Sequence, residues 1–135
     1  QHGCDSHRHD PLADLNLTLD GQRASYLALA SLADELCSGR WVSTGGGGYS
    51  VLNVVPRAWT HLLGIVSGEP VEPSTPVPKA WRMEIGESAP LTMSDGAAAT
   101  FRPFEEGFAP HSRVDQAILA TRQAVFPELG IDPSL

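Results

Sequence analysis

Lysine is almost absent from this sequence. Of the 135 residues, 9 are basic and 16 acidic, and Lys79 is the only lysine. The formal net charge of -7 argues against a nucleic-acid surface, because such surfaces cluster lysine and arginine to neutralise phosphate. Cysteine is scarce too, and Cys4 and Cys37 are too few for a disulfide framework. Hydrophobic residues make up 41% of the chain, enough to argue against general disorder.

Long hydrophobic runs are also missing. None approaches the roughly 18 apolar residues that a membrane-spanning helix needs. The first ten residues, QHGCDSHRHD, are polar and unlike a secretory signal. We therefore expect no membrane partner, no nucleic-acid partner and a cytoplasmic location. The first residue is Gln1 rather than Met, which favours a fragment or a processed chain.

Periodic apolar residues predict helices in the first half of the chain. Residues 22–37 have helical spacing, with Asp20 as the expected N-cap and Gly39 just beyond the end. A second helix is predicted over residues 53–67, with Asn53 as its cap. Both predictions rest on a broad apolar face opposite a polar one.

The second half has weaker patterns. Residues 69–78 contain four prolines and predict a stiff loop. A short helix is predicted over residues 79–85, and a last helix over residues 112–126 with Ser112 as its cap. Glycine and proline interrupt the rest of this half.

Strand signals are few. Residues 40–43, RWVS, are the one clear candidate, and residues 15–20 alternate in a way that fits a short strand or an extended segment. The strand–loop–helix order predicts an α/β fold. One short strand cannot make a parallel sheet, so either that prediction is wrong or the rest of the sheet lies on chain that is missing here.

The start of the chain is rich in possible metal ligands. Its spacing lacks a repeated C-x-x-C or an H-E-x-x-H, so a polar surface loop explains it as well as a metal site does. The residues concerned are His2, Cys4, Asp5, His7, His9 and Asp10.

The stretch TGGGGYS, residues 44–50, allows three interpretations. The first is a phosphate-binding loop. It is disfavoured because the sequence has neither G-x-x-x-x-G-K-[ST] nor G-x-G-x-x-G with its later acidic residue, and because no lysine is near. A tight strand-to-helix turn is the second. In the third, the glycines form a close wall and aim Tyr49 into a pocket, where a phenol can donate a hydrogen bond to an oxyanion.

Taken together, these segments resemble the C-terminal third of the zinc-dependent deacetylases, which comprise the class I histone deacetylases and the bacterial acetoin-utilization deacetylases. The resemblance covers about residues 1–68, and the tail with FRPFEEGF looks closer to the acetoin-utilization branch. The matching positions are Gln1, Gly3, Asp5, Asp10–Pro11, Asn16–Thr18, Gly45–Tyr49, Asn53 and Trp59.

The resemblance implies roles for single residues. Asp5 matches an aspartate ligand of the catalytic Zn²⁺, whose other ligands are expected on a missing N-terminal part. Tyr49 matches the tyrosine that hydrogen-bonds the acetyl carbonyl. Leu12, Gly47 and Gly48 match residues lining the acyl-lysine tunnel. No ligand position of the family matches His2, Cys4, His7 or His9.

The fold implied is the C-terminal portion of the arginase/deacetylase fold, a parallel sheet flanked by helices, incomplete in this chain. Residues 1–135 would form a partial deacetylase domain, with the active-site segments in 1–68, an irregular region over 69–111 and a helix over 112–126.

The function implied is that of the C-terminal part of a protein-lysine deacetylase, hydrolysing acetyl-lysine to lysine and acetate. The substrate would be an acetylated lysine of a protein or a small acetylated amide. No paired histidines and no D-x-H placed for the family's roles occur in the sequence, so this chain should be inactive without the N-terminal part of its domain. The alternative is a truncated, non-catalytic module, and the upstream sequence would separate the two.

Overall fold

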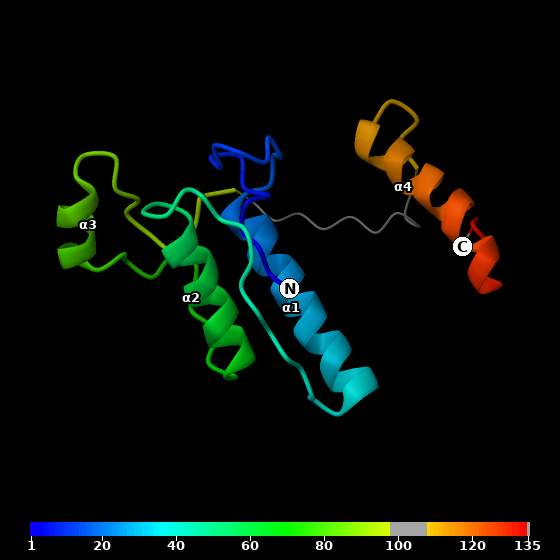
Figure 1. Cartoon of the computed structure of the whole chain (residues 1–135), viewed down its shortest axis with the longest axis horizontal. Helices are drawn as coiled ribbons and strands as arrows, with labels where there is room; N and C mark the ends of the chain where they lie inside the picture. Colours follow the sequence, from blue (N-terminus) through cyan, green and yellow to red (C-terminus); the bar gives the residue numbers. More distant parts are fainter. Residues whose placement is uncertain (98–107, 135) are drawn as a thin grey trace. The chain divides into compact units, whose positions relative to one another are not determined.

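A computed structural model describes residues 1–97 and 108–134 (Figure 1). The chain divides into two compact units, Gln1–Ala99 and Thr100–Leu135. No helix in the described residues is both long and apolar enough to cross a bilayer. The first unit holds α1 (Leu19–Cys37), α2 (Val55–Val66) and α3 (Lys79–Ile85), and the second holds α4 (Arg113–Val125) and the 3-10 helix η2 (Pro127–Leu129).

Helix α1 confirms the first predicted helix and begins three residues earlier than expected. Its N-cap is Thr18, whose hydroxyl accepts a hydrogen bond from the Gly21 N–H at 3.1 Å. The prediction that Asp20 is the cap is therefore wrong, because Asp20 lies inside the first turn. The helix ends in left-handed backbone at Ser38 and Gly39, with φ of 52° and 73°, which confirms the glycine stop.

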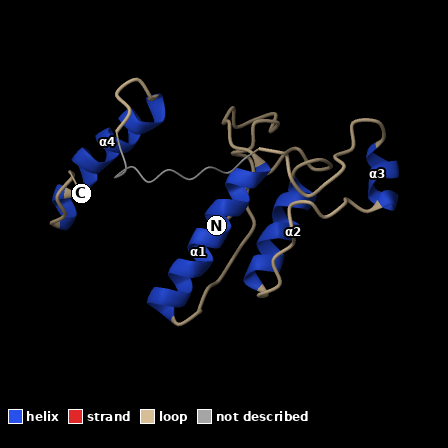
Figure 2. Ribbon diagram, turned by 180° about the vertical axis from the view of Figure 1, so that it is seen from behind, coloured by secondary structure: helices blue, strands red, loops and turns tan. Residues whose placement is uncertain are grey.

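Helix α2 confirms the second predicted helix, with Pro56 in its first turn. Asn53 is not its cap: the capping position is Val54, and its side chain makes no capping hydrogen bond. Helices α1 and α2 lie side by side (Figure 2). Their contact buries two apolar clusters, which comprise Cys4, Leu19, Val54 and Ala58 in one and Tyr26, Leu62 and Ile65 in the other.

The last two predicted helices are confirmed. Helix α3 has the predicted bounds, and α4 lies within one residue of them. Ser112 caps α4 by accepting a hydrogen bond from the Asp115 N–H at 3.2 Å. Residues 98–107, which belong to the predicted irregular region, lie outside the described residues. The three-part division of the chain stays a prediction.

No strand occurs in the described ranges, so the strand predicted over residues 40–43 is wrong. Two backbone bonds lie just beyond it, from His2 N–H to Thr44 O at 2.8 Å and from Cys4 N–H to Gly47 O at 2.7 Å. Between these two bonds the N-terminal segment advances two residues, from His2 to Cys4, whereas the glycine segment advances three, from Thr44 to Gly47. This mismatch in register prevents a regular ladder.

The predicted parallel sheet is likewise not found in 1–97 or 108–134. What occurs instead is a pair of isolated bridges, a parallel one between His7 and Leu17 and an antiparallel one between Pro76 and Thr92. Of residues 15–20, only 15–18 precede α1, and the last two form its first turn. A strand needs a continuous partner, and these residues have none within the described part of the chain.

Candidate functional site

The four-glycine run lies directly against the first five residues (Figure 1). A Cβ added to Gly47 would overlap the Asp5 carboxylate, with Asp5 Cγ only 2.6 Å away. A Cβ on Gly48 would lie 2.6 Å from Cys4 Sγ. None of the four glycines has a positive φ, and the run carries no turn. Close approach of other groups, rather than a tight turn, therefore requires glycine here.

The Asp5 carboxylate is held between two glycines. On its other side, a Cβ added to Gly3 would lie 3.0 Å from Asp5 Oδ1. No donor from residues 1–97 or 108–134 hydrogen-bonds this carboxylate. Asp5 is partly exposed, and a carboxylate oxygen is an ordinary zinc ligand.

Asp5 fits one ligand position of a metal site but does not make a site alone. The described residues contain no group of three or more histidine, cysteine, aspartate or glutamate side chains that could hold a metal ion. Any further ligands must come from outside that part of the chain.

The other metal-type residues near the start serve packing and internal hydrogen bonds. The ring of His2 is buried and lies 5.3 Å from those of both Tyr26 and Trp41. Burial lowers the pKa of His2 and raises that of the buried Cys4 thiol. His7 is fully buried. These positions favour a structural role over a second metal site.

Tyr49 lies next to this contact, with half of its surface exposed. Its backbone N–H donates to Oδ2 of Asp10 at 2.9 Å. Oδ1 of the same carboxylate accepts from the N–H groups of Leu12 and Ala13, at 2.9 and 3.2 Å. Burial raises the pKa of Asp10, but these N–H groups and that of Ser50 outweigh it and bring the pKa below its usual value.

The structure thus links the residues assigned from the resemblance in two sets of contacts. Gly47 touches Asp5, and the exposed Leu12 is joined to Tyr49 through Asp10. Their roles in metal and substrate binding stay predictions.

A buried ion network is centred on Asp95, and no sequence pattern indicates it. Its Oδ2 lies 2.7 Å from His7 Nε2 and accepts from the Leu19 N–H at 2.9 Å, and its Oδ1 accepts from Arg57 at 3.0 Å. Burial raises the pKa of Asp95, but Leu19, His7 and Arg57 together lower it to about 2. The partners lie 38 to 88 residues away in sequence, so no local pattern could have indicated them.

The segment around Asp95 is fixed at other points as well. Asp20 accepts hydrogen bonds from Ser94 Oγ at 2.7 Å and from the Ala97 N–H at 3.2 Å. The buried His61 ring lies 2.6 Å from the Met93 carbonyl oxygen through Nε2. These contacts hold residues 93–97 against α1 and α2.

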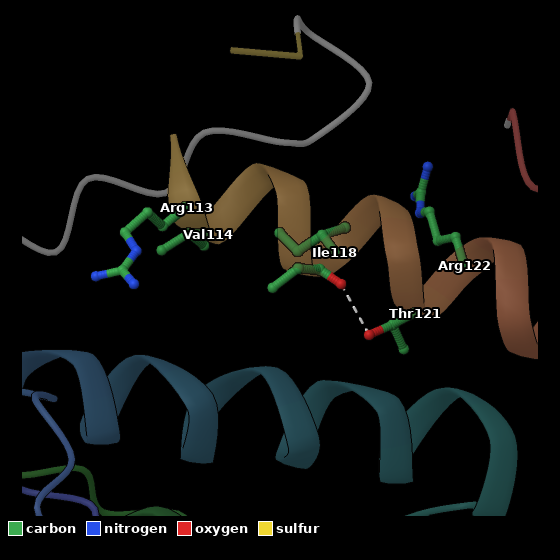
Figure 3. A pocket seen from close by; sticks show the side chains of 6 residues that line it. Arg113, Val114, Ile118, Thr121 and Arg122 are labelled. Atoms are coloured by element: carbon green, nitrogen blue, oxygen red, sulfur yellow. Dashed lines mark hydrogen bonds between the residues drawn. The ribbon is translucent and has the colours of Figure 1, made fainter. Parts of the chain in front are cut away.

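The second unit has a separate surface feature. A shallow, mainly apolar groove runs along α4 (Figure 3). The Thr121 hydroxyl in it donates to the Ala117 carbonyl at 2.8 Å, so it is used within the helix. None of the residues assigned from the resemblance lies there. The groove is lined by Arg113, Val114, Ala117, Ile118, Thr121 and Arg122.

Comparison with known proteins agrees with the position of the site. The sequence pattern described as the histone deacetylase domain matches residues 1–66. The acetoin utilization protein AcuC of Bacillus subtilis (strain 168) is 32% identical over 93 residues, which are 69% of this chain and 24% of the relative. That of Staphylococcus xylosus is 38% identical over 81 residues, 59% of this chain and 20% of the relative. No solved structure matches the chain.

The chain thus spans about a quarter or less of the length of these relatives. The matched segment contains Asp5, Leu12, the four glycines and Tyr49. This match, which covers just under half of the chain, and these relatives support the histone deacetylase family, on the branch of the acetoin utilization proteins.

Proposed function

We propose that this chain is the C-terminal part of a zinc-dependent protein-lysine deacetylase that hydrolyses acetyl-lysine to lysine and acetate. The observation that carries the proposal is the contact of Gly47 with the Asp5 carboxylate, beside the half-exposed Tyr49. The match of residues 1–66 to the histone deacetylase domain supports the reaction type. The small share of the relatives that is covered supports a partial domain.

Each residue has a task in this reaction. Asp5 would supply one oxygen ligand to Zn²⁺, and when bound the metal polarises the acetyl carbonyl and activates water. Tyr49 would donate a hydrogen bond to the carbonyl oxygen as it becomes negative. Gly47 and Gly48, without side chains, leave room for a narrow acyl-lysine chain, and Leu12 would cover part of that chain.

The remaining zinc ligands and the acid–base groups belong, in this proposal, to the N-terminal part of the same domain. That part is the partner the chain requires. The substrate is an acetylated lysine of a protein or a small acetylated amide, and the protein acts in the cytoplasm. Asp5 is the ligand that this chain would contribute in such a division.

Tyr49→Phe in the complete protein tests the proposal. The change removes only the hydroxyl, and losing one oxyanion donor raises the barrier by about 2.7–4 kcal/mol. We expect kcat on an acetyl-lysine peptide to fall about 10²- to 10³-fold. Zinc content should stay near that of the wild type.

Tyr26→Phe is the matched control. Tyr26 is buried in the α1–α2 contact, and its hydroxyl has no partner among the described residues. Turnover should therefore be unchanged. Wild-type turnover in Tyr49→Phe would refute the role of Tyr49, and a complete protein with neither zinc nor turnover would favour the non-catalytic module.

A further inference from the structure

One buried carboxylate joins two segments of the proposed site. Asp10 is 9% exposed and bonds the Tyr49 N–H, 39 residues away in sequence, through Oδ2. Through Oδ1 it holds the N–H groups of Leu12 and Ala13. Charge-assisted bonds of this kind are among the stronger ones in proteins.

Tyr49 has little else to fix its direction. Its side chain is half exposed, and its hydroxyl makes no hydrogen bond to any residue in the described ranges. The glycine run before it is held by the Cys4 N–H bond to Gly47 O at 2.7 Å, and the next backbone contact along the described chain is the Asp10 bond at Tyr49 itself. The direction of the ring therefore depends on where the Tyr49 N–H is held.

We infer that Asp10 is a positioning residue for Tyr49. By holding the Tyr49 and Leu12 backbones on opposite oxygens, it fixes the phenol relative to the rim of the acyl-lysine tunnel. The inference rests on the proposed function, because it concerns the tyrosine that would donate to the acetyl carbonyl.

The chemistry of the site requires a carboxylate. An ionised carboxylate only accepts hydrogen bonds, and both Asp10 oxygens face N–H donors. An asparagine would turn its NH₂ group toward one of these donors. Asp10→Asn must therefore release either Tyr49 or the Leu12 segment, whichever way its amide is turned.

The test compares kcat on acetyl-lysine and trifluoroacetyl-lysine peptides in the complete deacetylase. Fluorine makes the carbonyl more electrophilic, so the second substrate depends less on an oxyanion donor. The ratio of the two rates does not depend on the fraction of protein that is folded. The variants are Asp10→Asn, Asp10→Glu, Tyr49→Phe and the double variant Asp10→Asn with Tyr49→Phe.

Asp14→Asn is the matched control. Asp14 is exposed, lies four residues further along the same loop and makes no side-chain hydrogen bond within the described residues. The substitution removes the same charge and keeps a residue that tolerates the left-handed backbone there, at φ 51°. Both rates should equal those of the wild type.

We expect Asp10→Asn to lower kcat on acetyl-lysine about 10- to 100-fold, as a misplaced catalytic group does. Zinc content should stay normal, and the trifluoroacetyl-to-acetyl ratio should rise as in Tyr49→Phe. Asp10→Glu, which keeps both acceptors, should restore part of the ratio. In the Tyr49→Phe background, Asp10→Asn should change kcat little, because both act through one group.

Two results would overturn the inference while leaving the proposed function intact: an unchanged ratio in Asp10→Asn, or fully multiplicative losses in the double variant. A third result is different in kind. If Tyr49→Phe itself leaves both rates at wild-type values, the role proposed for Tyr49 fails, and the positioning role of Asp10 fails with it; the proposed function itself fails only if the wild type turns over neither peptide.

Discussion

Replacing Gly47 by alanine would place a methyl group where the Asp5 carboxylate lies. The added carbon would be 2.6 Å from Asp5 Cγ, whereas ordinary contact begins at 3.4 Å, so one group must move by close to an ångström. The clash is with a short side chain that has few ways to move aside. Overpacking of this kind costs about 1–3 kcal/mol of unfolding free energy.

The same shift should weaken metal binding by the complete protein. If about 1.4–2.8 kcal/mol of the strain falls on Asp5, the Kd for Zn²⁺ rises about 10- to 100-fold. Competition with a chelator measures this Kd, and chemical denaturation of the metal-free protein measures the stability.

Gly21→Ala is the matched control for this substitution. Gly21 lies in the first turn of α1, where the added carbon meets only ordinary contacts at 3.5 and 3.9 Å. It should leave zinc affinity unchanged and stabilise the protein by up to about 1 kcal/mol. Wild-type zinc affinity and stability in Gly47→Ala would refute the reasoning.

Three other substitutions in the complete protein test the packing of the first unit. Thr18→Ala should cost about 1 kcal/mol in denaturant unfolding, because the α1 cap is lost; no loss would contradict the cap. Arg57→Met should cost about 3–5 kcal/mol, because Asp95 stays buried without its guanidinium; a loss below about 1 kcal/mol would oppose this. Asp95→Asn should cost on the order of 2 kcal/mol at neutral pH. The folded pKa of about 2 lies below the ordinary 3.8, so the unfolded state binds more protons, and the stability from Asp95 is full above about pH 4 and is lost as pH falls through 2. The difference in unfolding free energy between the wild type and Asp95→Asn should therefore shrink as the pH falls from about 4 to 2. A difference that stays constant over this pH range would contradict the prediction.

The helices could be predicted because their signals are local. Apolar spacing predicted the two long helices of the first unit, and α3 has the predicted bounds. The N-cap residues of the helices are harder to predict. Thr18 and Asp20 are both good N-cap residues. Asp20 instead bonds Ser94 Oγ, 74 residues away, a contact that no local rule contains.

The candidate site was predictable in outline only. The glycine run indicated close approach, but the sequence alone could not say that Asp5 is the group that approaches. The sequence indicates Asp10 only as a possible metal ligand and as part of the matching D-P pair, although its carboxylate joins Tyr49 and Leu12. The prediction of a strand over residues 40–43 is wrong because a strand needs a neighbouring strand to pair with. β-Propensity alone does not produce a hydrogen-bonded ladder.

The central claim is that Asp5 and Tyr49 lie on one side of a deacetylase site. The most direct measurement is a crystal structure of the complete protein with an acetyl-lysine peptide, trapped by a variant of its general base. We predict an Asp5 oxygen among the zinc ligands and the Tyr49 hydroxyl about 2.7–3.1 Å from the acetyl oxygen. A metal bound without Asp5, or an acetyl group held away from Tyr49, would contradict the account.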